Sequence, residues 1–193
     1  TSPVTLSISP SLPAGLAMST STGAITGTPT SSSSATNYTV TATDANGATS
    51  SKTFVLTVSA ALTTTLAISA ETLTASAVAT AFTPVTASGG TSAITLSISP
   101  SLPAGLAINA STGAITGTPA TDSAAANYTV TATDANGATS SKTFALTVSV
   151  ALTTTLVTPS QTFTVSTVAT PFTPVTSSGG TPNIVFSIAP TLP

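Results

Sequence analysis

Two aspartates at equivalent positions, Asp44 and Asp134, have the residue type and spacing that most directly suggest chemistry. Each lies in a Thr-Asp-Ala-Asn-Gly motif, and a carboxylate in such a loop could bind Ca²⁺. A calcium site needs about six to eight oxygen ligands, several of them carboxylates. The alternative is that Asp134 only stabilises a turn, because Asp at the first position and Gly at the fourth favour a type I turn.

The other carboxylates that could join Asp134 are Glu71 and Asp122. Glu71 is replaced by Gln161 at the equivalent position 90 residues later, and Asp122 is Ser32 at the position 90 residues earlier. A ligand set that changes between equivalent stretches of one chain is a poor candidate for a metal site. We therefore expect no metal and no cofactor, and we expect Asp134 to be a turn residue.

Lys52 and Lys142 are the only basic residues. A lysine buried beside an acid and an asparagine could form an intramolecular Lys–Asn isopeptide bond. However, the predicted register places Lys142 near a strand end, where its aliphatic stem can cover apolar surface while the amine stays in water. Ser141 points to the opposite face of the same strand, so the two cannot form a Ser/Lys nucleophile. We expect no catalytic residue and no enzyme activity.

The composition excludes most other chemistry. The 193 residues contain no His and no Cys, which removes the usual general base, zinc ligands and thiol nucleophile. A net charge of −2 with two lysines cannot neutralise a run of phosphates, so nucleic acid and anionic lipid are excluded as partners. No apolar run is long enough for a membrane-spanning helix, and residues 1–4 carry no export signal.

Two features of the sequence could involve sugars, as sites of glycosylation or as a binding surface. Asn37, Asn109 and Asn127 lie in Asn-x-Ser/Thr sequons, which permit glycosylation without showing it. Tyr38 and Tyr128 could form a platform for a bound glycan, but aromatic residues make up only 4% of the chain and these two are in phase with the predicted core. A core role is therefore favoured over carbohydrate binding.

The elements that position these residues are repeated. The string SLPAGLA occurs at residues 11–17 and 101–107, and an offset of 90 leaves 48 of 60 positions identical between 1–60 and 91–150. The same offset matches 61–90 with 151–180 at 20 of 30 positions. A repeat of this length suits a small domain rather than a solenoid unit.

We predict three segments: a C-terminal portion of a repeat at 1–59, a complete repeat at 60–149, and an N-terminal portion at 150–193. Either the sequence is a window of a longer array, or the partial repeats of neighbouring copies complete each other by strand exchange. The window is favoured, because the last 13 residues duplicate what the first 13 already supply.

Alternating apolar and hydroxyl residues predict about eight short strands in the complete repeat. The runs are Leu66–Ile68, Phe82–Val85, Ile94–Ile98, Tyr128–Ala132 and Phe144–Val148. A hairpin turn at residues 134–137 places Tyr128 opposite Phe144 and Val130 opposite Lys142, which buries one face of the pair and leaves the other in water. The buried face comprises Tyr128, Val130, Ala132, Phe144, Leu146 and Val148, and the wetted face Thr129, Thr131, Thr133, Thr143, Ala145 and Thr147. The predicted core comprises Tyr128, Val130, Phe144, Leu146, Leu102, Leu106, Ile108, Ile115, Ile98 and Phe82, and the glycines needed for backbone geometry are Gly105, Gly113, Gly117 and Gly137.

The string SLPAGLAINASTGAITGTP followed by NYTVTATDANGATSSKTFALTV resembles the bacterial putative-Ig family, also called He PIG. Its pattern of LPxGL, TGxIxGTP and a YxVTxTDxxG hairpin occurs here nearly letter for letter. The resemblance implies an all-β chain of tandem immunoglobulin- or cadherin-like antiparallel β-sandwich domains. It also implies strings of such domains on secreted or surface proteins, without catalytic residues.

These observations predict a structural, extracellular or cell-surface tandem Ig-like protein, as a segment of a surface stalk or of a self-assembling filament. The expected partners are copies of itself, because faces rich in Thr, Ser and Ala with 3% charged residues do little to repel one another. The alternative is an adhesin or carbohydrate-binding module.

Overall fold

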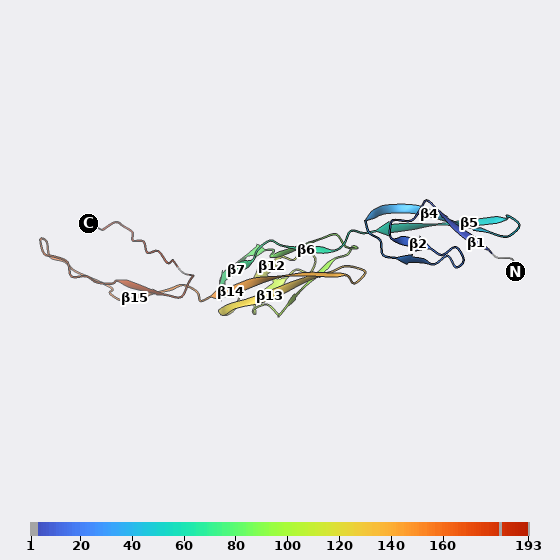
Figure 1. Ribbon diagram of the computed structural model, residues 1–193. Coiled ribbons are helices and arrows are strands. Elements are labelled where there is room, and N and C mark those ends of the chain that lie inside the picture. The colour runs from blue at the N-terminus through green and yellow to red at the C-terminus, as the bar shows by residue number, and fades with distance from the viewer. Residues whose placement is uncertain (1–3, 182, 193) are drawn as a thin grey trace. The chain divides into compact units, whose positions relative to one another are not determined.

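The computed structural model describes residues 4–181 and 183–192 (Figure 1). The described chain is all β, with strands β1 to β16 and no helix, so no helix there could cross a membrane. The prediction that the first residues carry no export signal concerns residues 1–4, of which residues 1–3 lie outside the described part. The outermost residues of the predicted segments 1–59 and 150–193 lie outside it too.

The chain divides into two compact units. Unit 1 contains residues 4–63 together with Ser88–Ile94 and Asp134–Ala138. Unit 2 contains Thr64–Ala87, Thr95–Thr133 and the residues from Thr139 onward.

Unit 1 is built on an antiparallel sheet of three strands in the order β1-β4-β5. These are β1 (Thr5–Ser9), β4 (Ser33–Thr43) and β5 (Thr49–Val58), and a hairpin of β2 (Leu16–Met18) and β3 (Ile25–Gly27) accompanies them. Tyr38 is buried in this unit, and its ring stacks on Phe54 with centroids 5.8 Å apart.

The next part of the chain, from residue 63 to residue 149, forms nine strands, one more than expected. Its sheets have the orders β10-β13-β14-β7, β11-β12-β8 and β6-β9, and a further hairpin, β15-β16, follows. The bounds are β6 Thr63–Leu66, β7 Ala70–Thr74, β8 Ala79–Phe82, β9 Val85–Ser88, β10 Thr95–Ser99, β11 Leu106–Ile108, β12 Ile115–Gly117, β13 Ser123–Thr133, β14 Thr139–Ser149, β15 Thr153–Leu156 and β16 Val175–Ser178.

The β10-β13-β14-β7 sheet and the β11-β12-β8 sheet face each other across a common core, which makes unit 2 a β-sandwich. Phe82 on β8 and Phe144 on β14 meet edge to face, with ring centroids 6.3 Å apart. Tyr128 on β13 lies 6.0 Å from the same Phe144 ring. The aromatic cluster therefore joins the strands β8, β13 and β14 from both sheets.

The 90-residue repeat of the sequence is also a repeat of the strand register. β1 pairs with β4 through Leu6 and Ala42, and β10 pairs with β13 through Leu96 and Ala132 at the same offset. The hairpins β4–β5 and β13–β14 also share every pairing, including the irregularity near their open ends.

The predicted hairpin register is confirmed, because Tyr128 pairs with Phe144 and Val130 with Lys142. All six residues of its predicted inner face are buried. The predicted outer face is only partly exposed to water. Thr143 is exposed, and the other five residues are half-buried, namely Thr129, Thr131, Thr133, Ala145 and Thr147. Uncharged Thr and Ala side chains on neighbouring strands shield one another from water.

The predicted core is only partly correct. Phe82, Ile115, Tyr128, Val130, Phe144 and Leu146 are buried, but Ile98, Leu102, Leu106 and Ile108 are only half-buried. The latter group lies on edge strands and in the loop between them, where one side stays open. The core also contains four residues that the pattern did not select: Leu73, Ala75, Val85 and Leu96.

The single strand expected over Phe82–Val85 is wrong, because the chain changes sheets there. β8 ends at Phe82 and β9 begins at Val85. Pro84 has no N–H to donate to a ladder, and its carbonyl accepts bonds from Ala67 and Ile68 at 2.8 and 3.2 Å. The strand expected over Leu66–Ile68 ends at Leu66, because the next two residues, Ala67 and Ile68, bond to Pro84.

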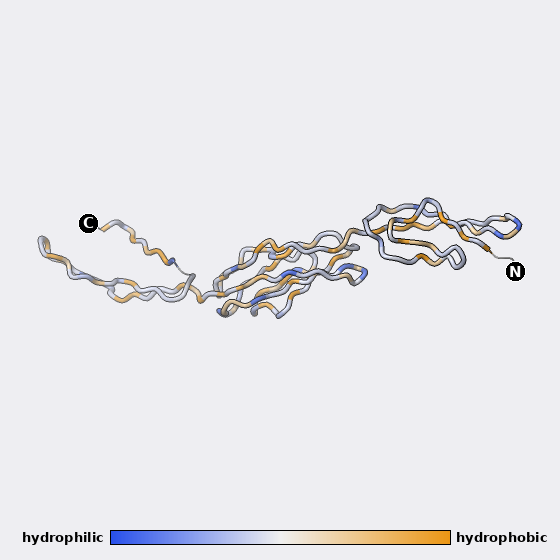
Figure 2. The backbone as a smooth tube through the Cα atoms, viewed as in Figure 1, coloured by the Kyte–Doolittle hydropathy of each residue, from blue (hydrophilic) through white to orange (hydrophobic). Residues whose placement is uncertain are grey.

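Figure 2 shows that strongly hydrophilic stretches are few and short along the chain.

Candidate functional site around Asp134

Asp134 closes the β13–β14 turn as the sequence predicts. The N–H of Gly137 donates to the Asp134 carbonyl at 3.0 Å, and Gly137 adopts a positive φ of 82°. The carboxylate atom Oδ1 accepts bonds from the N–H groups of Asn136 and Ala138, each at 2.9 Å. These are the bonds of an Asx turn, in which the side chain replaces a backbone acceptor.

The same carboxylate also holds a second loop. Oδ2 of Asp134 accepts a hydrogen bond of 2.9 Å from the N–H of Thr91, and the residue is only 8% exposed. The bond from Thr91 lowers the pKa of Asp134 most, and the bonds from Ala138 and Asn136 lower it further, while desolvation opposes them. Asp134 is therefore the anchor of two loops as well as a turn residue.

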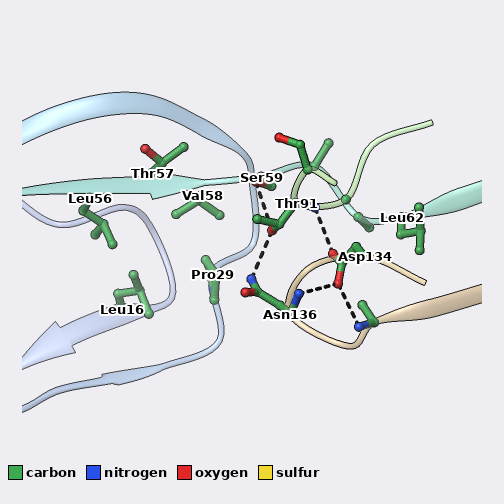
Figure 3. Close-up of a pocket in the computed structure, with 15 residues that line it drawn as sticks. Leu16, Pro29, Leu56, Thr57, Val58, Ser59, Leu62, Thr91, Asp134 and Asn136 are labelled. Atoms are coloured by element: carbon green, nitrogen blue, oxygen red, sulfur yellow. Dashed lines mark hydrogen bonds between the residues drawn. The ribbon is translucent and has the colours of Figure 1, made fainter. Parts of the chain in front are cut away.

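Side chains extend this network within unit 1. Nδ2 of Asn136 donates to Oγ1 of Thr91 at 3.0 Å, and that hydroxyl donates to Oγ of Ser59 at 3.4 Å. The N–H of Gly90 donates to the carbonyl of Ala60 at 2.7 Å. Figure 3 shows these groups converging beside the end of β5. The loop 88–94 is thus fixed to two other segments of the same unit.

A pocket of about 640 Å³ lies beside this network, and all its lining residues belong to unit 1. Its apolar wall includes Leu16, Pro29, Leu56, Val58 and Leu62 (Figure 3). Its polar wall carries Thr91, Asp134 and Asn136, whose hydrogen bonds are directed to one another and to the backbone. Asp134 is the pocket's one carboxylate, and its oxygens already accept bonds from three backbone N–H groups.

The calcium hypothesis finds no support in the geometry of Asp134. Its oxygens face backbone N–H donors, which are directed where a cation would have to lie. In residues 4–181 and 183–192, no group of three His, Cys, Asp or Glu residues is placed to hold a metal ion. Asp44, at the equivalent position 90 residues earlier, forms the same Asx turn through the N–H groups of Asn46 and Ala48.

Lys142 lies opposite Val130, as predicted, and its side chain is exposed. A lysine in water lacks the burial that an isopeptide bond requires. Ser141 is exposed on the neighbouring position of β14, and alternate residues of a strand point to opposite faces. These residues therefore form no reactive pair.

The residues considered for sugar chemistry separate into two groups. Tyr38 and Tyr128 are 4% and 6% exposed, so neither ring can stack on a glycan. The sequon residues Asn37, Asn109 and Asn127 are exposed. Asn109 also accepts bonds from the N–H groups of the two residues that follow Ala110, at 2.9 and 3.0 Å, which shapes its own turn.

Two distant residues of this network were not identified from the sequence: Thr91, which donates to Asp134, and Ser59, which accepts a bond from Thr91. Thr91 and Ser59 lie 43 and 75 positions away and belong to no motif, so local patterns cannot connect them. The adjacent Gly89-Gly90 pair was the available signal: both residues have positive φ, and a side chain on Gly89 would overlap the carbonyl of Ala61. A glycine pair of this kind marks a place where two backbones meet closely.

Comparison with family models gives a match at residues 1–59 and again at 61–149, to a family described as a putative Ig domain, He_PIG. Comparison with the curated proteins gives no match.

Several solved structures match the chain, each with a TM-score below 0.5. A C-terminal fragment of intimin, in complex with the intimin-binding domain of its translocated receptor, matches with a TM-score of 0.47 and 18% identity over 78% of this chain and 53% of that one. Mouse cadherin-23 EC22-24 gives a TM-score of 0.38 and 16% identity over 77% and 53%, and human protocadherin-24 EC1-2 gives 0.42 and 14% over 76% and 82%. The chain spans about half the length of the first two structures.

Proposed function

Since the chain belongs to the He_PIG family of Ig-like domains over residues 1–59 and 61–149, we propose that it is a structural, extracellular or cell-surface tandem repeat protein that carries mechanical load. The domains would be the predicted segments 1–59, 60–149 and 150–193. The chain would act as part of a surface stalk or filament, and it would have no catalytic role.

The observation that carries this proposal is the pairing of β7 with β14. The two strands are parallel, and five residue pairs join them, from Ala70 and Ala145 to Thr74 and Ser149. β7 lies near the start of the complete repeat and β14 at its end. A force applied to the two ends of the repeat therefore acts along this ladder and loads its hydrogen bonds together, instead of opening them one at a time.

The surface of the site supports a structural role as well. The polar groups around Asp134 are used to fix loops, and the two tyrosines that could bind sugar are buried. No observation favours the carbohydrate-binding alternative over a structural role. The uncharged faces, with 3% charged residues in the chain, suit packing against other repeats.

Single-molecule force spectroscopy tests the proposal. Pulling the chain from its two ends should give an unfolding peak that releases roughly 300 Å of chain from the 90-residue repeat, at about 3.3–3.6 Å per residue. As a control, the variant Asp122→Cys allows pulling from the start of β13 and the C-terminus, at the open end of the hairpin where Ser123 pairs with Val148. This geometry opens the β13–β14 hairpin pair by pair, so it should need a clearly lower force.

Two results would contradict the proposal. One is extension of residues 60–149 from their ends without a resolved peak. The other is specific binding on a glycan array, abolished by substitutions in one patch of this chain, which would favour an adhesin.

A further inference from the structure

The turn between β13 and β14 contains an asparagine directly before a glycine. Asn136 and Gly137 are both exposed, and a methyl group built on Gly137 would meet no atom within 4 Å. An Asn-Gly pair in an open turn is prone to deamidation, because the glycine has no side chain to shield its backbone nitrogen. The turn therefore has a reactivity that its structural role beside Asp134 does not use.

The reaction is an attack of the Gly137 backbone nitrogen on the side-chain carbon Cγ of Asn136. The new N–Cγ bond closes an imide ring and the Cγ–Nδ2 bond breaks. The leaving amide nitrogen takes up the proton that the Gly137 nitrogen loses, and departs as ammonia. Water then adds to one of the two imide carbonyls and breaks one C–N bond of the ring. The product is an aspartate or an isoaspartate, in which the main chain runs through the former side chain.

Both reacting groups are held in hydrogen bonds in the folded chain. The N–H of Gly137 donates to the Asp134 carbonyl at 3.0 Å, and Nδ2 of Asn136 donates to Oγ1 of Thr91 at 3.0 Å. Figure 3 shows the Asn136 side chain directed at Thr91. Ring closure requires the first bond to break so that the nitrogen is free, and the second to break so that the side chain can rotate towards it.

The loop that carries Thr91 is bonded to the turn through its backbone as well. The N–H of Thr91 donates to Oδ2 of Asp134 at 2.9 Å, and the N–H of Ala135 donates to the Thr91 carbonyl at 3.1 Å. Together with the Asn136 bond, these contacts join Thr91 to three consecutive residues of the turn. Release of the Asn136 amide is therefore coupled to a local opening between loop 88–94 and the turn.

The charge of Asp134 also opposes the reaction in the closed turn. Oδ1 of Asp134 accepts bonds of 2.9 Å from the N–H groups of Asn136 and Ala138, which flank Gly137. As the Gly137 nitrogen loses its proton, negative charge develops close to this carboxylate. Like charges at short range repel each other, so the closed turn disfavours the attack.

The product of deamidation does not fit the closed turn. An isoaspartate adds one main-chain carbon between the N–H groups of residues 136 and 138, which both bond to Oδ1 of Asp134. Either product also places a second carboxylate beside that of Asp134, and two neighbouring carboxylates disfavour each other's charged forms. The bonds that Asp134 makes to the turn and to loop 88–94 are weakened as a result.

We propose that Asn136 is a site of spontaneous deamidation and that Thr91 controls its rate. The amide is protected while loop 88–94 is bonded to the turn, and an opening of the loop exposes it. Once the reaction is complete, the product hinders the loop from closing again. The co-reactant is water, and no enzyme is required. The inference goes beyond the proposed structural function, and neither depends on the other.

Asn46 provides an internal reference in the full 193-residue chain, because residues 43–52 and 133–142 have the same sequence. The chain is kept in mildly alkaline buffer prepared with heavy-oxygen water, and peptide mapping by mass spectrometry measures the label at both asparagines. In denaturant, Asn46 and Asn136 should react at the same rate. In the folded chain, Asn136 should react at least about tenfold more slowly than it does in denaturant.

The variant Thr91→Val tests the control by Thr91, because it removes the hydroxyl but keeps both backbone bonds. The loss of one hydrogen bond should make Asn136 react roughly three- to tenfold faster, while the rate at Asn46 stays the same. Ser59→Ala is the matched control, since it removes the other partner of the same hydroxyl and should leave the rate at Asn136 unchanged. Hydrogen exchange of β13 and β14 should be the same in both variants, which shows that the repeat remains folded.

Two further variants test the route and its consequence. Gly137→Ala shields the backbone nitrogen, and its methyl group has free space, so the rate at Asn136 should fall at least about tenfold. Asn136→Asp reproduces the aspartate product. It should speed the hydrogen exchange of residues 88–94 relative to the wild-type chain.

The inference is overturned if Asn136 reacts as fast in the folded chain as in denaturant. It is also overturned if Thr91→Val leaves the rate unchanged, or if Ser59→Ala raises it as strongly as Thr91→Val. Continued labelling of Asn136 in Gly137→Ala would exclude the route through the backbone nitrogen. Unchanged exchange of residues 88–94 in Asn136→Asp would exclude the effect on the loop.

Discussion

The N–H of Thr91 donates a hydrogen bond of 2.9 Å to Oδ2 of Asp134, across 43 positions of sequence. Asp44 occupies the equivalent turn and forms the same local bonds through Oδ1. The two aspartates thus share a motif and a turn. Asp134 also accepts the bond from Thr91, whose equivalent at the 90-residue offset, Thr1, lies outside the described residues.

Asp134→Asn should lower the melting temperature of the chain by several degrees. The amide keeps the shape of the side chain but loses the charge that strengthens three N–H bonds. Asp44→Asn is the matched control, and it should have a smaller effect, because Asp44 is only half-buried whereas Asp134 is buried. Circular dichroism melts of the two variants measure the difference, and equal effects would contradict a tertiary role for Asp134.

Lowering the pH into the acid range should reduce the contribution of Asp134 to the stability of the folded chain. Its folded pKa lies below the ordinary value of 3.8, so its stabilising effect is fully present above that value and is lost as the pH falls through the folded pKa. The difference in melting temperature between the wild-type chain and Asp134→Asn should be constant near neutral pH and shrink below about pH 4. A difference in melting temperature that grew in acid would contradict a lowered pKa of Asp134 in the folded chain.

Calcium should not affect stability. The Asp134 oxygens accept bonds from three backbone N–H groups, and such donors exclude a cation from the same positions. Melting temperatures in excess EDTA and in millimolar CaCl₂ should agree within error. If calcium raised the melting temperature of the wild-type chain but not that of Asp134→Asn, a metal site at this turn would be required.

Phe144→Ala should destabilise the complete repeat by about 3–5 kcal/mol, the usual cost of removing a buried Phe. Its ring is 1% exposed and contacts both Phe82 and Tyr128. Phe54→Ala should cost less, because Phe54 is half-buried and stacks only on Tyr38. Hydrogen exchange resolved by peptide during denaturant titration separates the two effects, and a larger loss for Phe54→Ala would contradict this assignment of the core.

Gly117→Ala should be far more damaging than Gly137→Ala. Both glycines have positive φ, 128° and 82°, but a methyl group on Gly117 would overlap the carbonyl of Gly105, whereas nothing lies within 4 Å of one on Gly137. Gly137→Ala should therefore cost only the left-handed backbone strain of about 1–2 kcal/mol. Chemical denaturation measures both, and similar losses would mean that the overlap at Gly117 is relieved by movement of the loop.

Ser123→Ala should leave stability unchanged or raise it slightly. The hydroxyl oxygen of Ser123 is buried without a hydrogen-bond partner in the described part of the chain, and so is that of the equivalent Ser33. Removal of an unpaired buried hydroxyl relieves its desolvation cost. A loss of more than about 1 kcal/mol in denaturant titration would show instead that water satisfies the group.

Local patterns in the sequence predicted the features that depend on near neighbours. The β13–β14 register followed from one turn and strict alternation, so Tyr128 was correctly placed opposite Phe144. Pairings between distant segments were not predictable in this way. The parallel ladder between β7 and β14, the change of sheet at Pro84 and the bond from Thr91 to Asp134 all join stretches that no short motif connects.

The parallel ladder also constrains how the chain is made. Ala70 on β7 leaves the ribosome long before Ala145 on β14, so the nascent repeat cannot close its sandwich until its final strand has been synthesised. During that interval β7 and β8 expose apolar side chains, and strands of a nearly identical neighbouring repeat could capture them. Long-range closure of this kind is slow, so the half-made repeat stays open to such capture for longer than one built from local hairpins alone.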